Sequence, residues 1–361
     1  MTFSVKSTIN VGDESLNLLR ELKAKKIFFI TDPFVVESKM IDQVIRVLDE
    51  NQAYEIFKDI KPDPSKELVD KGKAALLSSQ ADLICAIGGG SAIDATKAII
   101  YDIYKEKGVK CPFVAIPTTA GTGSEATNFA VVTVGHDKLV LIDDIMLPDY
   151  ALLVPKFTKT VPNFITADTG MDVLTHALEA YVSKNASVYT DTFCEHIVGR
   201  VFEVLPKVYD EGDRLSLRKE MLELANMAGI AFNNAGLGIN HSLAHTIGGT
   251  FHVSHGRLNA ILLPFVIEYN CQRSQDAHVK LDCLAQKLGH RDYTCIIKVI
   301  KEMNCKFKIP EKLSGLGRID ANAYQNAIED MALTALHDRC TPTNPALVTK
   351  FDLANILRDA F

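Results

Sequence analysis

The first half of the chain alternates short apolar runs with amphipathic stretches. The apolar runs are rich in β-branched and aromatic residues and stop at turn-forming residues, as buried strands do. The amphipathic stretches carry apolar residues at helical spacing instead. This alternation predicts a mostly parallel sheet covered by helices. The predicted strands are residues 25–32, 53–60, 81–90 and the first part of 111–124, and the predicted helices between them are 40–52 and 66–80.

A different pattern begins after about residue 165. Three long segments have helical periodicity, and strand-like runs become scarce; the segments are "GMDVLTHALEAYVS", "TDTFCEHIVGRVFEVLPKVY" and "SLRKEMLELANMAGIAFNNAG". We therefore expect an α/β domain with a parallel sheet over residues 1–162 and an all-helical domain over residues 163–361. The boundary is expected near Val161 and Pro162.

Composition narrows the class of protein. The chain has 361 residues, of which 47% are hydrophobic and 23% are charged, as in a globular protein of two domains. A net charge of −6 gives no general attraction to nucleic acid or to an anionic membrane. The N-terminus lacks the pattern of a signal peptide, and no apolar run approaches the roughly 20 residues that span a bilayer. The eight cysteines form no C-x-x-C pair, which predicts reduced thiols in a cytoplasmic protein.

A glycine loop lies between a predicted strand and a predicted helix in "DLICAIGGGSAIDATKAII". Glycines let the backbone approach a ligand closely, and a helix start offers N–H groups to an anion. Neither the dinucleotide fingerprint nor a P-loop is present, because Ile93 replaces the third glycine and no G-K-[ST] follows. A structural turn with Ser91 as helix N-cap is the alternative. A second small-residue loop, "PTTAGTGSE" at 117–125, favours nucleotide binding at the carboxyl edge of the sheet.

Four of the ten histidines lie within "NHSLAHTIGGTFHVSHG", residues 240–256. His241 and His245 are one helical turn apart, and His255 follows. In the preceding segment Asp172 and His176 also share a helix face, where a simple Asp–His hydrogen bond is the alternative. Joined, Asp172, His176, His241 and His255 supply one oxygen and three nitrogens, which suits Fe(II) or Zn(II) better than Mg²⁺ or Ca²⁺. The lack of cysteine ligands indicates a catalytic site, and the other histidines are expected to be ordinary.

These motifs resemble those of one family. "GGGSAIDATKA", "IPTTAGTGSEAT", "TGMDVLTHALEAY" and "GLGINHSLAHTIGGTFHVSHG" are together similar to the iron-dependent (group III) alcohol dehydrogenases, over nearly the whole chain. The resemblance implies a Rossmann-like N-terminal domain and a helical C-terminal domain, the dehydroquinate-synthase-like architecture. Within the family the chain looks most like the 1-propanol dehydrogenases of diol-utilising bacterial microcompartments. One departure is Ala346 in "NPA", where relatives often have arginine.

The resemblance assigns roles to single residues. It implies that Asp172, His176, His241 and His255 hold the metal, and that His245 is a non-ligand histidine that carries a proton. Phe232 resembles an aromatic that lines the substrate tunnel. Asp32 corresponds to the acidic residue that meets the adenosine ribose, and capping of the helix at Pro33 is its alternative role. The other implied cofactor-binding residues are Gly88, Gly89, Gly90, Ser91, Asp94, Thr118, Thr119, Thr122, Thr127 and Lys138.

The activity implied is interconversion of short-chain primary alcohols, such as 1-propanol or ethanol, and their aldehydes with NAD(H). The expected metal is Fe(II), with Zn(II) as the alternative. A zinc-dependent polyol dehydrogenase of the glycerol type and a lyase resembling dehydroquinate synthase are rivals; residues 168–180 and 238–256 contain no Lys or Arg to hold the lyase's acidic substrate. An inactive cofactor-binding scaffold is the non-enzyme rival. Expected partners are a second copy of the chain and microcompartment shell proteins, with the enzyme in the cytoplasm or inside a microcompartment.

Overall fold

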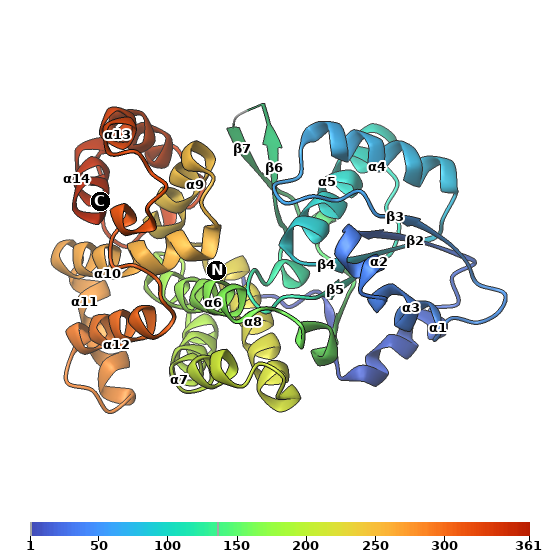
Figure 1. Ribbon diagram of the computed structural model, residues 1–361, viewed down its shortest axis with the longest axis horizontal. Coiled ribbons are helices and arrows are strands. Elements are labelled where there is room, and N and C mark those ends of the chain that lie inside the picture. The colour runs from blue at the N-terminus through green and yellow to red at the C-terminus, as the bar shows by residue number, and fades with distance from the viewer. Residues whose placement is uncertain (1, 136) are drawn as a thin grey trace. The chain divides into compact units, whose positions relative to one another are not determined.

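The computed structural model describes residues 2–135 and 137–361, without the side chains of 137 and 138. The chain forms two compact units (Figure 1). Among the described residues, the N-terminal unit consists of 4–135, 137–161 and 212–233, and the C-terminal unit of 2–3, 162–211 and 234–361. No helix in the described parts of the chain is long and apolar enough to cross a membrane.

A six-stranded sheet organises the N-terminal unit, with every neighbouring pair of strands parallel, as the sequence predicts. Its order is β1 (Thr8–Val11), β8 (Tyr150–Leu153), β5 (Phe113–Pro117), β4 (Leu83–Gly88), β2 (Lys26–Thr31) and β3 (Ala53–Phe57). The helices that accompany it are α1 (Leu18–Glu21), α2 (Pro33–Glu37), α3 (Met40–Ile45), α4 (Lys66–Ser79) and α5 (Gly90–Lys107).

Apolar residues on both faces of the central strands create two cores. Ile27 and Phe29 of β2 pack with residues of α1, α2 and α3 in one core. Phe28 and Ile30, which alternate with them along the strand, pack with residues of α4 and α5 in the other. Successive side chains of a strand point to opposite faces, so a strand buried on both faces is apolar throughout. This explains why β2, β4 and β5 are continuous apolar runs in the sequence.

Two features of this unit differ from the sequence prediction. An antiparallel hairpin of β6 (Phe129–Val134) and β7 (Asp137–Ile142) follows the second loop. In addition, residues 212–233, which the sequence assigns to the helical domain, belong by their contacts to the N-terminal unit. They form most of α8 (Leu215–Ala235), whose Gly229 lies so close to Gly123 that a Cβ on Gly229 would be 2.5 Å from the Gly123 carbonyl oxygen.

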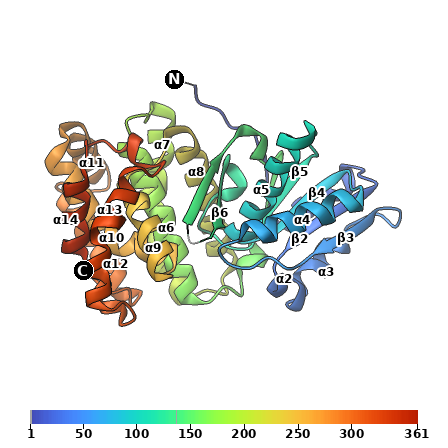
Figure 2. The ribbon, with the colours of Figure 1, turned by 90° about the horizontal axis from the view of Figure 1, so that it is seen from above.

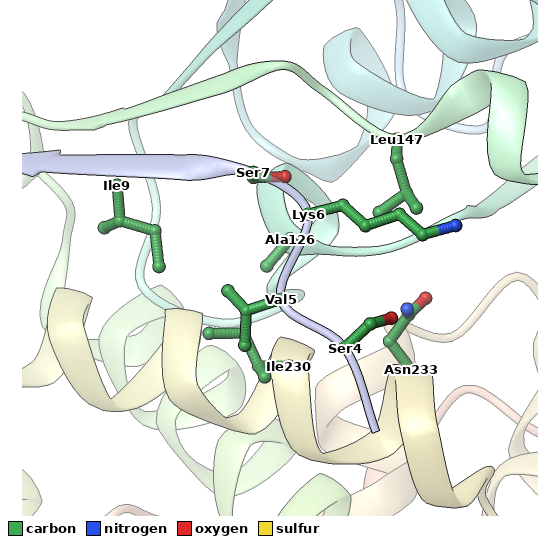
Figure 3. A pocket seen from close by; sticks show the side chains of 9 residues that line it. All are labelled: Ser4, Val5, Lys6, Ser7, Ile9, Ala126, Leu147, Ile230 and Asn233. Carbon is green, nitrogen blue, oxygen red and sulfur yellow. The ribbon is translucent and has the colours of Figure 1, made fainter. Parts of the chain in front are cut away.

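Residues 4–9 also pack in the N-terminal unit. This segment runs alongside α8, and a small pocket lies between the segment and the helix (Figure 3). Figure 3 shows Val5 against Ile230 of α8, and Ser7 donates a hydrogen bond to the Pro148 carbonyl oxygen at 2.6 Å. These contacts bring together the start of the unit, its last strand and α8. The pocket contains none of the residues predicted to bind a ligand.

The C-terminal unit is helical in its described residues, as predicted. Its helices are α6 (Asn163–Val182), α7 (Val188–Asp210), α9 (Ile239–Phe251), α10 (His255–Arg273), α11 (Gln275–Lys287), α12 (Tyr293–Lys306), α13 (Ala321–Leu336) and α14 (Lys350–Ala360). Helix α6 is buried along nearly its whole length because α7 and α10 pack against it (Figure 2). Short 3₁₀ helices complete the two units: η1 (Asp13–Asn17), η2 (Ser124–Ala126), η3 (Asp144–Met146), η4 (Pro155–Thr158), η5 (Leu313–Leu316) and η6 (Thr341–Thr343).

Candidate functional site

Helix α6 presents a polar row inside the apolar interior of the C-terminal unit. Asp172, His176 and Glu179 are spaced four and three residues apart, so their side chains share one face of the helix. All three are buried. A carboxylate or an imidazole away from water needs a hydrogen-bond partner, an ion pair or a metal. This burial weighs against the alternative of an Asp–His pair on the helix surface.

Helices α9 and α10 bring two more histidines to Asp172. His241 lies in the first turn of α9, and His255 is the first residue of α10. The Nε2 atoms of His241 and His255 are 3.8 Å and 3.7 Å from Asp172 Oδ1. His176 Nε2 is 4.0 Å from Asp172 Oδ2, and its ring stacks on that of His241. The structure thus gathers the four predicted ligands, although they are up to 83 residues apart in the sequence.

This donor set fits a transition metal. Ligands about 2.0–2.2 Å from one ion are themselves roughly 3–4 Å apart, which is the spacing of Asp172 from each of the three histidines. Asp172, His176 and His241 also have ligand atoms within 4.8 Å of one another. Burial and the neighbouring histidines hold the pKa of His241 well below its ordinary value, and a neutral imidazole is the form that binds metal. Asp172, His176 and His241 are buried, whereas the His255 side chain is 32% exposed. The centre is therefore closed on the α6 side and accessible beside His255, as a catalytic site requires.

Two buried side chains orient the donors. Glu179 Oε2 lies 2.5 Å from His241 Nδ1, so a proton on Nδ1 leaves the lone pair of Nε2 for a metal. Burial raises the pKa of Glu179, whereas backbone N–H groups of residues 238, 240 and 241 act in the opposite direction and favour the carboxylate. Asn259 Nδ2 donates to Asp172 Oδ1 at 2.6 Å and lies 3.2 Å and 3.1 Å from Nε2 of His241 and His255.

The start of α10 is fastened to α6 beside the donors. Asp168, one turn before Asp172, accepts hydrogen bonds from Ser254 Oγ at 2.9 Å and from Arg257 Nε at 3.0 Å. Gly256 permits this close approach, because a Cβ there would lie 2.2 Å from the Asp168 carbonyl oxygen. These contacts bracket His255 on both sides and fix its distance from Asp172.

In the N-terminal unit, the predicted cofactor residues follow the carboxyl ends of three adjacent strands. Asp32 comes directly after β2, Gly88 ends β4 and is followed by Gly89 and Gly90, and Thr118 follows β5. Thr31 is in register with Ile87, and Gly88 with Pro117, so the three loops lie side by side. This edge of a parallel sheet is where nucleotides bind in doubly wound folds.

The glycine loop is shaped by close packing. Gly89, not Ser91, is the N-cap of α5, so the alternative role of Ser91 is wrong. No side chain among the described residues caps this 18-residue helix, so its first N–H groups point to the loop region. Gly88 has a φ of +155°, and a Cβ on Gly90 would lie 2.7 Å from Thr122 of the second loop. Glycine is therefore required for the two loops to meet.

Two family models together match nearly the whole chain. The model "Iron-containing alcohol dehydrogenase" matches residues 7–155, and "Fe-containing alcohol dehydrogenase family, C-terminal" matches residues 166–361, which carry the metal donors. The chain belongs to the iron-containing alcohol dehydrogenase family. It is therefore an oxidoreductase, as the sequence predicts.

Relatives and solved structures agree with this membership. The chain is 37% identical to the "1-propanol dehydrogenase PduQ" of Citrobacter freundii, over 99% of both chains, and 35% identical to an "NADPH-dependent butanol dehydrogenase" of Clostridium saccharobutylicum, over 99% of this chain and 97% of the other. The iron-containing alcohol dehydrogenase of Thermococcus thioreducens has the same fold, with a TM-score of 0.93, 27% identity and 99% of both chains covered. A sulfoacetaldehyde reductase from Bifidobacterium kashiwanohense in complex with NAD+ has a TM-score of 0.88 and 25% identity, over 99% and 98% of the two chains.

Two residues that were predicted to bind the cofactor of this alcohol dehydrogenase, Asp94 and Thr127, form hydrogen bonds within the protein. Asp94 accepts hydrogen bonds from Ser124 Oγ at 2.5 Å and from Val131 N at 3.0 Å, so it ties the second loop and β6 to α5. Thr127 Oγ1 accepts a hydrogen bond from Lys97 Nζ at 2.9 Å. The sequence did not single out Lys97, which is fully buried and also donates to Ser124 Oγ and to the Phe129 carbonyl oxygen. Burial lowers the pKa of Lys97 to about 8, against the opposing charges of Asp94 and Glu125.

Of the two roles weighed for Asp32, capping of α2 is observed and contact with the ribose stays a prediction. Its Oδ1 accepts a hydrogen bond from Val35 N at 3.0 Å and caps α2, with Pro33 as the first helical residue. Its Oδ2 faces the glycine loop, because a Cβ on Gly88 would lie 3.1 Å from it. One oxygen therefore serves the fold, and the other remains at the edge where the loops meet.

The remaining predicted residues are placed as follows. Phe232 lies in α8 of the N-terminal unit, with its ring edge-on to Phe129 at 5.9 Å between centroids. Its contact with substrate stays a prediction. The side chain of Lys138 and all of His136 lie outside the described part of the structure. His252 ends α9 with a φ of 53°, which gives this unassigned histidine a structural position.

Three residues beside the candidate metal centre were not predicted from the sequence. Glu179, Asn259 and Asp338 each bind a residue of the candidate centre through a buried or half-buried hydrogen bond. Glu179 could have been found, because it is on the same face of α6 as Asp172 and His176. Asn259 is one turn after His255 in the same way. Asp338 could not be found by helical spacing, because it is 93 residues from its partner His245.

Proposed function

We propose that this protein interconverts short-chain primary alcohols, such as 1-propanol or ethanol, and their aldehydes with NAD(H). The observation that carries the proposal is the convergence of the His241 and His255 Nε2 atoms on Asp172 Oδ1, beside His176. These four residues would hold Fe(II), or Zn(II) as the alternative. When bound, such an ion acts as a Lewis acid that polarises the oxygen of the alcohol or aldehyde.

The proposed reaction is reversible. In aldehyde reduction, hydride from NADH forms a C–H bond at the carbonyl carbon while the π electrons of the carbonyl move to oxygen. The oxygen then takes a proton, and NAD+ and the alcohol leave. Alcohol oxidation reverses each step. His245 is the proposed proton carrier, because its ring stacks on that of His255 at 5.2 Å while its Nδ1 is bound elsewhere.

The chain's own residues prepare the site for this chemistry. Glu179 holds His241 in a fixed orientation, with Nε2 left for a metal. Asn259 Nδ2 is hydrogen-bonded to Asp172 Oδ1 and lies close to both Nε2 atoms, so the amide would have to turn aside for a metal to take these lone pairs. Burial of the α6 side keeps water from three of the donors. Only His255 and His245 are partly exposed among the five residues, so substrate is expected to approach on their side.

NAD(H) is the proposed cofactor. The uncapped start of α5 and its three glycines favour the pyrophosphate. The Asp32 carboxylate favours an unmodified ribose over one that carries a 2′-phosphate, because the two negative charges would repel. The Clostridium relative is described as NADPH-dependent, so this preference is a specific expectation for the present chain.

Oligomeric state and location follow from the resemblance to 1-propanol dehydrogenases. We propose a homodimer or a higher homo-oligomer that is either free in the cytoplasm or inside a bacterial microcompartment with its shell proteins. The support is the 37% identity to PduQ over 99% of both chains.

The test is an activity and metal assay on protein purified without oxygen. Propanal, acetaldehyde, glycerone and longer aldehydes are each offered with NADH, and the loss of NADH absorbance is followed. We expect fastest turnover with short aldehydes, one metal ion per chain, and loss of both metal and turnover in His255→Ala. Turnover only with glycerone would indicate the polyol dehydrogenase, and a His255→Ala variant with full metal and turnover would contradict the ligand set.

A further inference from the structure

His245 is held by a residue from a distant part of the chain. It lies on α9 one turn after His241, with its ring parallel to that of His255 and its side chain 15% exposed. Its Nδ1 is 2.9 Å from Oδ2 of Asp338, which follows the end of α13. His245 therefore stands beside the metal donors, while one of its two nitrogens is engaged away from them.

Asp338 is itself fixed by two donors. Its Oδ1 accepts a hydrogen bond from the backbone N–H of Cys340 at 2.8 Å and one from Ser242 Oγ at 3.3 Å. The side chain is only 12% exposed. Burial acts to raise the pKa of Asp338, but its interactions with His245 and Cys340 outweigh burial and lower that pKa to about 2. The carboxylate is thus ionised at neutral pH and accepts hydrogen bonds only.

An acceptor at Nδ1 decides which nitrogen of a neutral imidazole carries the hydrogen. We propose that Asp338 is a positioning residue that keeps His245 in the Nδ1–H form, so that the Nε2 lone pair on the far side of the ring is free to exchange a proton with substrate or water. This inference rests on the proposed function, because it explains how the proposed proton carrier is held ready.

A second metal site is the competing explanation for the same residues. His245, Asp338 and Cys340 each offer a ligand atom, and these atoms lie within 4.8 Å of one another. Burial, with Asp338 and Glu179 nearby, raises the pKa of the Cys340 thiol well above its ordinary value. A thiol that keeps its proton is a poor ligand, and the hydrogen bond already satisfies His245 Nδ1. The geometry therefore favours the positioning role.

The substitution Asp338→Asn should change the tautomer of His245 without changing the shape of the site. Cys340 N–H must keep an acceptor, so the amide oxygen faces Cys340 and the amide NH₂ faces His245 Nδ1. A donor there forces the imidazole hydrogen onto Nε2. The variant keeps the size of the side chain, reverses the direction of one hydrogen bond and removes one negative charge.

The experiment records ¹⁵N–¹H spectra of zinc-loaded protein labelled with ¹⁵N-histidine, in which His245 is assigned by its loss in His245→Gln. We expect the Nδ1–H form in the unaltered protein and the Nε2–H form in Asp338→Asn. An Nε2–H form in the unaltered protein overturns the proposal, and this measurement does not require Asp338→Asn to fold. A cadmium or zinc ion bound in excess of one per chain, and lost in Cys340→Ser, would also overturn it.

Turnover measurements connect the tautomer to the reaction. Asp338→Asn should lower kcat on the order of 10- to 10³-fold, with one metal ion still bound per chain. In a His245→Gln background the same substitution should cause no further loss, whereas independent losses that multiply would contradict the proposal. Asp320→Asn, which keeps the cap of α13, is the matched control and should leave kcat unchanged. If His245→Gln alone keeps full turnover, the proton-carrier role fails while the spectra still decide the role of Asp338.

Discussion

Glu179 Oε2 lies 2.5 Å from Nδ1 of His241, and Glu179 Oε1 accepts the backbone N–H of Asn240 at 2.7 Å. The carboxylate therefore spans the start of α9 and fixes both the backbone and the imidazole. Because Glu179 also shares a helix face with Asp172 and His176, α6 supplies two donors directly and holds a third through Glu179. The buried helix α6 is thus the organising element of the metal centre.

This relationship predicts the result of Glu179→Gln. The amide oxygen should stay with Asn240 N–H, which turns the amide NH₂ toward His241 Nδ1 and moves the imidazole hydrogen to Nε2. Metal affinity should fall about 10- to 100-fold, the usual cost of losing such a partner. Zinc competition against a chromophoric chelator measures the affinity without reference to turnover. Glu203→Gln on the exposed surface of α7 is the control, and equal affinities for the two variants would refute the role of Glu179.

Gly256 should be intolerant of any side chain. The Cβ of Gly256→Ala would lie 2.2 Å from the Asp168 carbonyl oxygen, so α10 must shift away from α6 and carry His255 with it. We expect a loss of about 1–3 kcal/mol in the free energy of unfolding, together with weaker metal binding. In Gly249→Ala, a Cβ meets no described atom within 4 Å, and stability should be unchanged or rise by up to about 1 kcal/mol. Similar urea midpoints for both variants would contradict the packing argument.

Asp32 offers a way to separate capping from cofactor choice. Asp32→Asn keeps a good N-cap for α2 but removes the negative charge. We expect its NADH-to-NADPH ratio of kcat/KM to fall roughly 10- to 100-fold while its thermal midpoint stays that of the unaltered protein. Asp32→Gly should change the ratio in the same direction. A ratio that is unchanged in both variants would leave Asp32 with its capping role alone.

The buried Lys97 predicts a pH dependence of stability. Its pKa is lowered from 10.5 to about 8 in the folded protein, so the unfolded chain binds more protons between pH 8 and pH 10.5. The contribution of Lys97 to the free energy of unfolding should therefore increase with pH across this window, by at most about 1.4 kcal/mol per pH unit, and its full cost should be present below pH 8.

The free energy of unfolding of the unaltered protein minus that of Lys97→Met isolates the contribution of Lys97. The other groups that titrate in the same pH range are present in both proteins and cancel. Urea unfolding at pH 7.5, 8.5 and 9.5 provides the comparison. The unaltered protein should gain stability relative to Lys97→Met as the pH rises. A difference that stays constant would show that Lys97 titrates at the same pH in the folded and unfolded states.

Much of this protein was determined by short-range patterns in the sequence. Apolar runs fixed the positions of β2, β4 and β5, and helical spacing placed Asp172 with His176 and His241 with His245, because both patterns depend only on the repeat of one local backbone conformation. The glycines after β4 could be predicted for the same reason, since a strand that turns at once into a helix leaves no room for side chains.

Other features were decided only when distant segments met. Residues 212–233 are a helical pattern like their neighbours, and nothing local shows that Gly229 packs on Gly123 of the N-terminal unit. Asp338 binds His245 across 93 residues, and Asn259 reaches Asp172 across 87. A polar side chain in a sequence shows what it can donate or accept, but burial and the path of the backbone select its partner. The sequence by itself therefore determined the candidate metal donors and the positions of the loops, because both depend on local spacing, and the tertiary structure decided which side chains contact them.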